Sequence, residues 1–273
     1  MTAYLNWGAA EAARLIAIPL ESDDKYSRGV LGIITGSAQY PGAAVLGVEA
    51  ALRTGVGMVR YLGPKNARSL VLQRRPEAVT SDGRVQAWLI GSGMDHQTRS
   101  DAAAKRMATA LEQAVPVVLD GGAFDLHSRA TGPVVMTPHY RELARVLGTD
   151  VADIAAHPAD AASDAAQQLG VTVLLKGHST YIAAPDGTRL VTSTAPSWLA
   201  TAGAGDALGG VLGALVATHW REVTDDGGML ARLAATAAVI HGLAAERASR
   251  GGPLTVLDLA AEVPGTIAGL LAK

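Results

Sequence analysis

Residues 29–62 contain a strand, a glycine-rich loop, a helix and a second strand in close succession. Gly29 to Thr35 is a short apolar run, the small residues from Pro41 to Ala44 open a helix that continues through Arg53, and a second apolar run covers Gly57 to Leu62. Two strands joined by one helix form a βαβ unit, whose strands are parallel and whose crossover is right-handed. This unit indicates an α/β fold built on a parallel sheet.

The same alternation continues along the chain. Further buried strands are expected over residues 85–91, 115–120, 133–136 and 171–176, and further helices over about 100–113, 140–147, 159–169, 205–218, 228–247 and 257–271. Two short strands, Thr180 to Ala184 and Arg189 to Ser193, flank the turn sequence Pro185-Asp186-Gly187 and predict an antiparallel hairpin at an edge of the sheet. The expected fold is a mostly parallel central sheet with helices on both faces.

The composition supports this fold and excludes several classes of function. Hydrophobic residues make up 49% and aromatic residues only 4%, so Ala, Val, Leu and Ile must build the core. The formal charge is 23 − 25 = −2 with scattered basic residues, which favours neither nucleic acid nor an anionic membrane as a partner. The absence of cysteine excludes disulfides, thiolate catalysis and Cys-ligated zinc.

No linker divides the sequence, so residues 1–273 are expected to form a single domain. The longest apolar stretches, Ala207 to Thr218 and Leu230 to Ala245, are interrupted by polar residues and glycine and are predicted to be buried helices. No targeting segment or span of about 20 apolar residues is found, which predicts a cytoplasmic protein without a membrane partner.

The run from Thr201 to Gly210 carries the strongest signal for chemistry. Its small residues allow the backbone to approach a phosphate, and the free amides and positive dipole end of the following helix attract an anion. Asp206 would repel that anion, yet it is well placed to take a proton from a hydroxyl that attacks the phosphate. The alternative is that Asp206 is an ordinary residue of a helix N-terminus.

Other polar segments follow the predicted strands and therefore converge on the carboxyl edge of the sheet, where ligands of open α/β sheets bind. They are residues 35–37 with 41–44, Gly91-Ser92-Gly93, Asp120-Gly121-Gly122, Thr137-Pro138-His139 and Lys176 to Thr180. Each segment alone is a weak signal, and Gly91-Ser92-Gly93 by itself is more typical of a tight turn.

Lys176 ends an apolar strand, where an ammonium needs an anionic partner, and Gly177 beside it would let a phosphate approach. His139 is either a ligand donor or a residue that packs at a helix N-terminus. His178 by itself is more typical of a solvated loop. The remaining histidines lack ligand spacing and are expected to be structural or exposed: His96, His127, His157, His219 and His241.

Taken in order, several segments resemble the ribokinase-like superfamily and, within it, the NAD(P)H-hydrate dehydratase family. The resemblance covers nearly the whole chain. Its carriers are residues 25–29, Gly36-Ser37 with residues 41–44, Glu49 to Gly57, Arg75-Pro76-Glu77-Ala78, Thr137-Pro138-His139, Leu175 to Thr180 and Leu199 to Asp206.

The chain departs from the family pattern at two places. The family usually has Asp-Ala-Asp-Ala-Leu where this chain has Asp120-Gly121-Gly122-Ala123-Phe124, so a second acid is missing at Gly122. The usual Gly-Thr-Gly-Asp is here Gly203-Ala204-Gly205-Asp206, which keeps the glycines of the anion site but loses a hydroxyl.

The resemblance implies which residues bind which ligand. Those implied to hold the adenine nucleotide are Lys176, Gly177, His178, Ser179, Thr180, Gly203, Ala204 and Gly205. Those implied to face the hydrated nicotinamide dinucleotide are Gly42, Ala43, Ala44, Gly93, His139 and Asp206, with Asp206 as the catalytic base. The metal ligands stay open.

The implied reaction uses ADP, or ATP, with Mg²⁺ to phosphorylate the C6 hydroxyl of the S epimer of NADH hydrate or NADPH hydrate; phosphate then leaves and NAD(P)H is restored. The family further implies a homo-oligomer, often a tetramer, in the bacterial cytoplasm. It also implies a separate epimerase acting on the same metabolite, because no epimerase domain is expected within residues 1–273.

Two other functions share these sequence features. A ribokinase-like kinase of a vitamin-precursor alcohol, such as hydroxymethylpyrimidine or hydroxyethylthiazole, would use the same base and fold but would accumulate a stable phosphate ester. A nucleotide sensor without turnover would be consistent with the acid lost at Gly122, whereas the presence of Asp206 argues against it.

Overall fold

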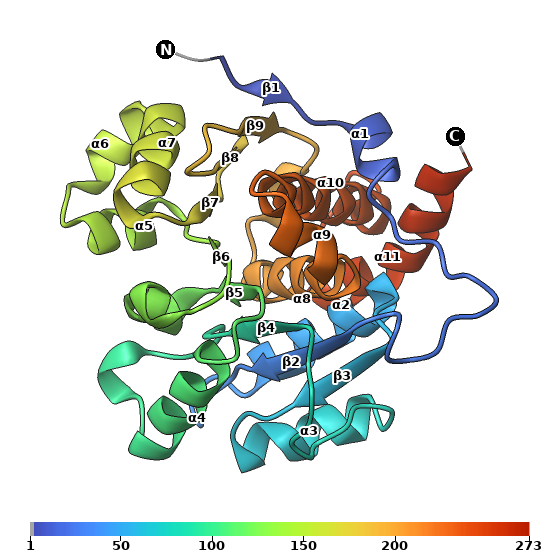
Figure 1. The fold of residues 1–273 in the computed structure, drawn as a ribbon. Coiled ribbons are helices and arrows are strands. Elements are labelled where there is room, and N and C mark those ends of the chain that lie inside the picture. Colours follow the sequence, from blue (N-terminus) through green and yellow to red (C-terminus); the bar gives the residue numbers. More distant parts are fainter. Residues whose placement is uncertain (1–2, 273) are drawn as a thin grey trace.

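Nine strands form one sheet in the computed structural model, which describes residues 3–272 (Figure 1). Their order across the sheet is β1-β9-β8-β7-β6-β5-β4-β2-β3. The strands are β1 (Leu5–Asn6), β2 (Val30–Ile34), β3 (Met58–Tyr61), β4 (Ala87–Ile90), β5 (Val117–Leu119), β6 (Val134–Met136), β7 (Thr172–Leu175), β8 (Thr180–Ala183) and β9 (Arg189–Thr192). All neighbours pair in parallel except β8, which is antiparallel to both β7 and β9.

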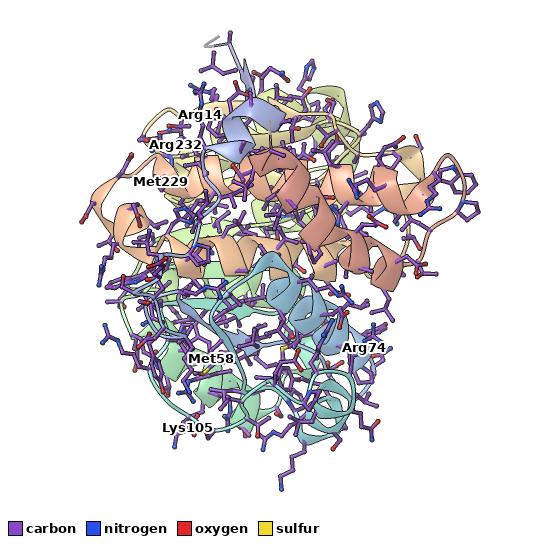
Figure 2. All side chains as sticks on the ribbon, turned by 90° about the vertical axis from the view of Figure 1, so that its right-hand side faces the viewer. Arg14, Met58, Arg74, Lys105, Met229 and Arg232 are labelled. Atoms are coloured by element: carbon purple, nitrogen blue, oxygen red, sulfur yellow. The ribbon has the colours of Figure 1, made fainter. Side chains whose placement is uncertain are left out.

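Helices cover both faces of the sheet and complete three layers. One face packs against α2 (Gly42–Thr54), α3 (Lys65–Arg74), α8 (Ala204–Thr218), α10 (Met229–Ser249) and α11 (Val256–Leu271). The other packs against α4 (Asp101–Leu111), α5 (Tyr140–Leu147), α6 (Val151–Ala156) and α7 (Pro158–Leu169), with the 3-10 segment η2 (Gly121–Arg129). Short elements fill the connections: α1 (Ala9–Ala13), η1 (His96–Thr98), η3 (Ser197–Leu199) and α9 (Trp220–Asp225). Figure 2 shows the first face, with α8, α10 and α11 in front of the sheet.

The expected α/β fold with its antiparallel hairpin is confirmed, but the position of the hairpin at the sheet edge is wrong. The strand β1 pairs in parallel with β9 and takes the outer position. A strand of two residues, Leu5 and Asn6, has no periodic pattern that a sequence could reveal. The helix α3 was also not predicted, because its exposed face is mostly polar and only Ala67 and Val71 are buried.

The helix α10 confirms the prediction of a buried apolar helix. Among residues 3–272 it alone is long and apolar enough to cross a membrane, with a mean hydropathy of 1.2, and 78% of that window is buried inside the protein. Burial on this scale is typical of a core helix.

Glycines bring α8 unusually close to α2 and to the sheet. A Cβ at Gly210 would lie 2.2 Å from the carbonyl oxygen of Gly47 in α2, and a Cβ at Gly213 would lie 2.9 Å from Leu31 of β2. Gly209 likewise faces Leu89 of β4, with 3.2 Å available for a Cβ. Gly209 and Gly210, at the end of the Thr201 to Gly210 run, thus serve helix packing rather than ligand binding.

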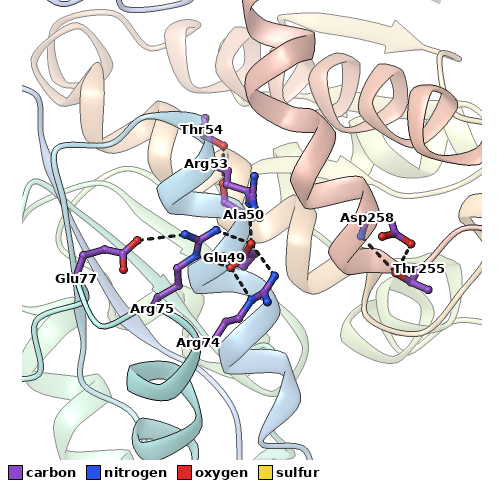
Figure 3. A network of polar contacts seen from close by, with 9 residues as sticks. All are labelled: Glu49, Ala50, Arg53, Thr54, Arg74, Arg75, Glu77, Thr255 and Asp258. Carbon is purple, nitrogen blue, oxygen red and sulfur yellow. Dashed lines mark hydrogen bonds and ion pairs between the residues drawn. The ribbon is translucent and has the colours of Figure 1, made fainter.

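A buried carboxylate joins α2 to α3 and to the segment after it (Figure 3). Glu49 is fully buried and accepts hydrogen bonds from Arg75 Nη2 at 2.6 Å and Arg53 Nε at 2.7 Å. Arg74 Nε contacts the other carboxylate oxygen at 3.2 Å. Burial raises the pKa of Glu49, but the three guanidinium groups outweigh burial and lower it to about 2. Two family segments, at Glu49 and Arg75, are therefore connected by a structural ion cluster.

We expect Glu49→Gln to lower the free energy of unfolding by about 3 kcal/mol, because it leaves three guanidinium groups without their buried counter-charge. The pKa of Glu49 is about 2 in the folded protein and 4.5 as its ordinary value, so the stabilisation is present above pH 4.5 and is lost as pH falls toward 2. In thermal unfolding, the difference in Tm between the wild type and Glu49→Gln should become smaller as the pH falls from 4.5 toward 2.

Glu77→Gln is the matched control, because Glu77 is half exposed and its one ion pair within residues 3–272 is with Arg75, at 3.3 Å. A loss of stability in Glu49→Gln no larger than in this control would contradict the structural role of the cluster.

Candidate active site

A cavity of about 720 Å³ opens at the carboxyl edge of the sheet. Its floor is made by the ends of the central strands and its walls by the loop after β9, the first turn of α8 and the middle of α10. Its titratable lining includes Asp120, His139, Lys176, Asp206 and His241. The cavity therefore lies where the polar segments were expected to converge.

A buried ion pair connects the strand ends at the cavity floor. The Lys176 ammonium donates to Asp120 Oδ1 at 3.1 Å, and its distance to Glu142 Oε2 is 3.8 Å. The Asp120 carboxylate also accepts hydrogen bonds from Thr137 Oγ1 at 2.7 Å and Ser92 Oγ at 3.0 Å. The anionic partner that Lys176 needs is thus Asp120, whose own hydrogen-bonding capacity is largely used.

These charges set the protonation of Lys176. Burial lowers the pKa of its ammonium, but the carboxylates of Asp120, Glu142 and Asp206 outweigh burial and raise the pKa above its usual value. Lys176 therefore carries a fixed positive charge into the cavity, which suits the phosphates of a nucleotide.

Asp206 lies in the first turn of α8 and has a different environment. Burial and the negative charge of Asp120 raise its pKa to about 7, against the opposing effect of Lys176. The ammonium of Lys176 pairs with Asp120 and Glu142 rather than with Asp206. A carboxylate with a pKa near neutrality is suited to proton transfer at physiological pH.

The first turn of α8 has the backbone geometry expected of an anion site. Gly203 is in the left-handed region with φ 92°, and a Cβ there would lie 2.5 Å from Leu46 of α2. A Cβ at Gly205 would lie 3.2 Å from Lys176 Nζ, so the backbone at Gly205 and the ammonium are close neighbours. Free amides of a helix start and a lysine ammonium thus face the same space.

His139 caps α5. Its Nδ1 accepts from the Glu142 N–H at 3.2 Å, and Glu142 Oε2 accepts from the His139 N–H at 2.8 Å, which forms a capping box. Its backbone also forms a parallel bridge with Lys176, and its half-exposed side chain lines the cavity. The position at a helix N-terminus is therefore observed, and contact with a ligand stays a prediction.

The other predicted residues divide into two groups. Gly177, His178, Thr180, Gly203, Ala204 and Gly205 line the cavity with Lys176. Ser179 is not among the lining residues, and its Oγ lies 2.8 Å from Ser193 Oγ. Gly42, Ala43, Ala44 and Gly93 also lie outside the lining set.

Gly93 and α2 nevertheless contact each other closely. Gly93 has φ 66°, and a Cβ there would lie 2.3 Å from the Cβ of Ala43. The side chains of Ala43 and Ala44 are buried, so this part of α2 offers a ligand mainly its backbone. A Cβ at Gly42 would meet nothing within 4 Å, which leaves space at the start of the helix.

His241 lines the cavity from α10 and was not expected to be a site residue. Burial lowers its pKa to about 4, so its imidazole is neutral at physiological pH. Its Nε2 is buried and has no hydrogen-bond partner in the described range, residues 3–272. The sequence does not indicate that His241 lines a cavity, because a histidine within an apolar helix is equally consistent with core packing.

The acid missing at Gly122 has a structural explanation. A Cβ at Gly122 would lie 2.5 Å from the backbone carbonyl carbon and oxygen of Met94. The glycine allows η2 to contact the loop that follows Gly93, and an acidic side chain does not fit between them.

Comparison with known proteins identifies the family of this chain and agrees with its fold. The sequence profile described as NAD(P)H-hydrate dehydratase matches residues 31–262. An ADP-dependent (S)-NAD(P)H-hydrate dehydratase of Xanthomonas campestris is 32% identical, over 96% of this chain and 94% of that protein. The chain belongs to the NAD(P)H-hydrate dehydratase family.

A bifunctional NAD(P)H-hydrate repair enzyme of Mycobacterium tuberculosis is 40% identical over 80% of this chain. The match covers 47% of that relative, so the chain spans about half the length of these bifunctional proteins.

Two solved structures share the fold. An ADP/ATP-dependent NAD(P)H-hydrate dehydratase of Bacillus subtilis, crystallised with ATP and Mg²⁺, has a TM-score of 0.85 and 26% identity over 98% of this chain and 99% of that chain. A ribokinase-like superfamily protein of Enterococcus faecalis has a TM-score of 0.82 and 22% identity over 99% of this chain and 97% of that chain. The ribokinase-like fold expected from the sequence is confirmed.

We expect Asp206→Asn to stabilise the protein at neutral and alkaline pH. The folded pKa of Asp206 is about 7 and its ordinary value is 3.8, so ionisation costs stability as pH rises from 3.8 to 7. The uncharged amide avoids this cost, and Tm should rise by at least about 2 °C above pH 7, with a smaller gain near pH 4.

Asp164→Asn, at an exposed position of α7, serves as the control and should leave Tm unchanged. Equal pH profiles of Tm in Asp206→Asn and the wild type would show that Asp206 is not destabilised by its site.

We expect Gly122→Asp to lower stability by about 1–3 kcal/mol through overpacking against Met94. Gly122→Ala should lower it as well, because the Cβ alone meets the Met94 backbone. Thermal unfolding of both variants measures the effect, and a tolerated aspartate would show that this loop has room for the family's second acid.

Proposed function

We propose that this chain is an ADP-dependent NAD(P)H-hydrate dehydratase that returns the S epimer of NADH hydrate or NADPH hydrate to the reduced dinucleotide. The observation that carries this proposal is the pairing, in one cavity, of an aspartate whose pKa is about 7 with a positively charged lysine and a helix N-terminus. The names of the family relatives, which are NAD(P)H-hydrate dehydratases and repair enzymes, support the same reaction.

The nucleotide is proposed to bind along residues 176–180 and 203–205. Lys176 would pair with its phosphates while the amides at the start of α8 donate to phosphate oxygens. The same cavity has a more apolar wall, where the adenine ring fits. This wall is formed by the loop of residues 195–201 and by Ala238 and His241 of α10.

Mg²⁺ fits this donor set. Mg²⁺ in proteins is held by one or two carboxylates together with substrate phosphates and water. Of the two carboxylates that line the cavity, Asp206 is the proposed base, so Asp120 would hold the ion through Oδ2, which accepts one hydrogen bond, from Ser92. When bound there, the ion would neutralise negative charge on the transferring phosphoryl group.

Asp206 is proposed to act as the general base. Its carboxylate takes the proton of the C6 hydroxyl, the hydroxyl oxygen forms a bond to the terminal phosphorus of ADP, and the phosphoanhydride bond breaks to release AMP. The ring nitrogen's electron pair then expels phosphate from C6, and transfer of a C5 proton to water restores the double bond of the dihydronicotinamide. Lys176 and the α8 amides stabilise the charge on the phosphoryl oxygens.

The hydrate is proposed to lie between α2, the Gly93 loop and α5. The backbone of Gly42, Ala43, Ala44 and Gly93 would contact it from one side, and His139 from the other. In this arrangement its C6 hydroxyl faces Asp206.

The family resemblance supports three further proposals. The chain would assemble as a homo-oligomer, a tetramer, and would act in the bacterial cytoplasm. A separate epimerase would supply the S epimer from the R epimer. Light scattering of the purified protein tests the oligomeric state.

The purified chain with S-NADH hydrate, Mg²⁺ and ADP should regenerate the dihydronicotinamide absorbance with release of phosphate. The rate should be higher with ADP than with ATP. It should rise with pH, reach half of its maximum near pH 7 and level off at about pH 8–9, because Asp206 must be deprotonated to accept the proton. Asp206→Asn should lower kcat by about 100-fold or more while the variant still binds ADP.

The other outcomes identify the competing functions. Accumulation of a stable phosphate ester from an added hydroxymethylpyrimidine or hydroxyethylthiazole, without recovery of NADH, would indicate the kinase. Nucleotide binding without turnover of any of these compounds would indicate the sensor.

A further inference from the structure

A second and smaller cavity, of about 260 Å³, lies beside the active-site cavity. We call it the outer cavity and define it by its lining residues His96, Gly121, Phe124, Asp125, His127, Glu142, Arg145 and Val146. Its residues come from η1, η2 and α5, and neither the sequence patterns nor the proposed chemistry assigns it a role.

The two cavities share a partition. Glu142 lines the outer cavity, while its Oε2 lies 3.8 Å from Lys176 Nζ, which lines the active-site cavity. Gly121 lines the outer cavity directly after Asp120, which lines the inner one. The capping box of His139 and Glu142 is thus the boundary between them.

The outer cavity also continues the two segments proposed to hold the hydrate. On α5, His139 is followed by Glu142 and Arg145 at three-residue spacing, which places all three on one side of the helix. In the other segment, His96 lies three residues after Gly93 and lines the outer cavity. A substrate that contacts Gly93 and His139, has its reacting end at Asp206 and is longer than one nucleotide would extend into the outer cavity.

The charges that remain available in the outer cavity are positive. Asp125 is paired with Arg99 at 2.6 Å, and Glu142 Oε2 lies 3.8 Å from the Lys176 ammonium and accepts from the backbone N–H of His139. Arg145 is exposed and forms no ion pair with any residue in the range 3–272. A free guanidinium is the preferred protein partner of a phosphate group, and the apolar side chains of Phe124 and Val146 complete the lining.

We propose that the outer cavity binds the adenosine phosphate half of the dinucleotide hydrate, with Arg145 contacting a phosphate group of that half. The assignment rests on the proposed function, because it takes the hydrate as the substrate of the adjacent cavity. It makes Arg145 a residue that binds the part of the substrate remote from the reaction, so its effect falls on KM rather than on kcat.

The test compares Arg145→Ala with Arg141→Ala, an exposed arginine of the same helix that does not line the cavity. Arg145→Ala should raise KM for the dinucleotide hydrates by about tenfold or more, as expected for loss of a hydrogen-bonded charge contact. The hydrate of reduced nicotinamide mononucleotide lacks the adenosine phosphate, so its KM should be the same in both variants.

The choice of dinucleotide identifies the phosphate. If Arg145→Ala raises KM for both NADH hydrate and NADPH hydrate, Arg145 contacts the phosphate that both share. If it raises KM for NADPH hydrate alone, Arg145 contacts the 2′-phosphate. An equal increase with the mononucleotide hydrate, or no increase relative to Arg141→Ala, would overturn the assignment.

Binding of NADPH itself, followed by its fluorescence, separates this assignment from the proposed function. Weaker binding in Arg145→Ala than in Arg141→Ala supports the subsite even if no hydrate is turned over, which would refute only the dehydratase. Equal binding in both variants, with normal hydrate turnover in the wild type, would refute only the subsite.

Discussion

The contact between α8 and α2 without intervening side chains fixes the position of the candidate active site. Gly47 and Gly210 allow the two backbones to meet, and Gly203 packs against Leu46 at the start of α8. A helix is stiff over the fifteen residues of α8, so a displacement at Gly210 is transmitted to Gly203 and Asp206. Gly47 and Gly210, which serve helix packing, thereby determine where the anion site and the base lie relative to the strands.

Two aspartates at this edge of the sheet have opposite electrostatic environments. Asp120 accepts hydrogen bonds from Ser92, Thr137 and Lys176. Asp206 is desolvated and repelled by Asp120, which brings its pKa to about 7. The buried ion pair therefore supplies a positive charge for phosphates and also helps to adjust the proton affinity of the proposed base.

The sequence predicts the parts of the molecule whose pattern is local. The apolar runs predict the long parallel part of the sheet, and Pro185-Asp186-Gly187 predicts the hairpin turn. The end of an apolar strand indicates Lys176, and the run of small residues at a helix start indicates Asp206. What depends on distant partners is not predicted. The apolar strand before Lys176 shows that its ammonium needs an anionic partner. Only the order of β5, β6 and β7 in the sheet shows that this partner is Asp120. Glu49 looks like an ordinary helical charge until α3 brings Arg74 and Arg75 to it.

The pairing of β1 with β9 also affects how the sheet meets other chains. An open hairpin strand exposes unpaired N–H and C=O groups, which are a template for intermolecular strand addition. Leu5 and Asn6 cover β9 and leave at that margin an outermost strand of only two residues. An edge of two residues offers too few backbone groups to recruit a further strand. Leu5 and Asn6 therefore protect the fold against edge-to-edge aggregation.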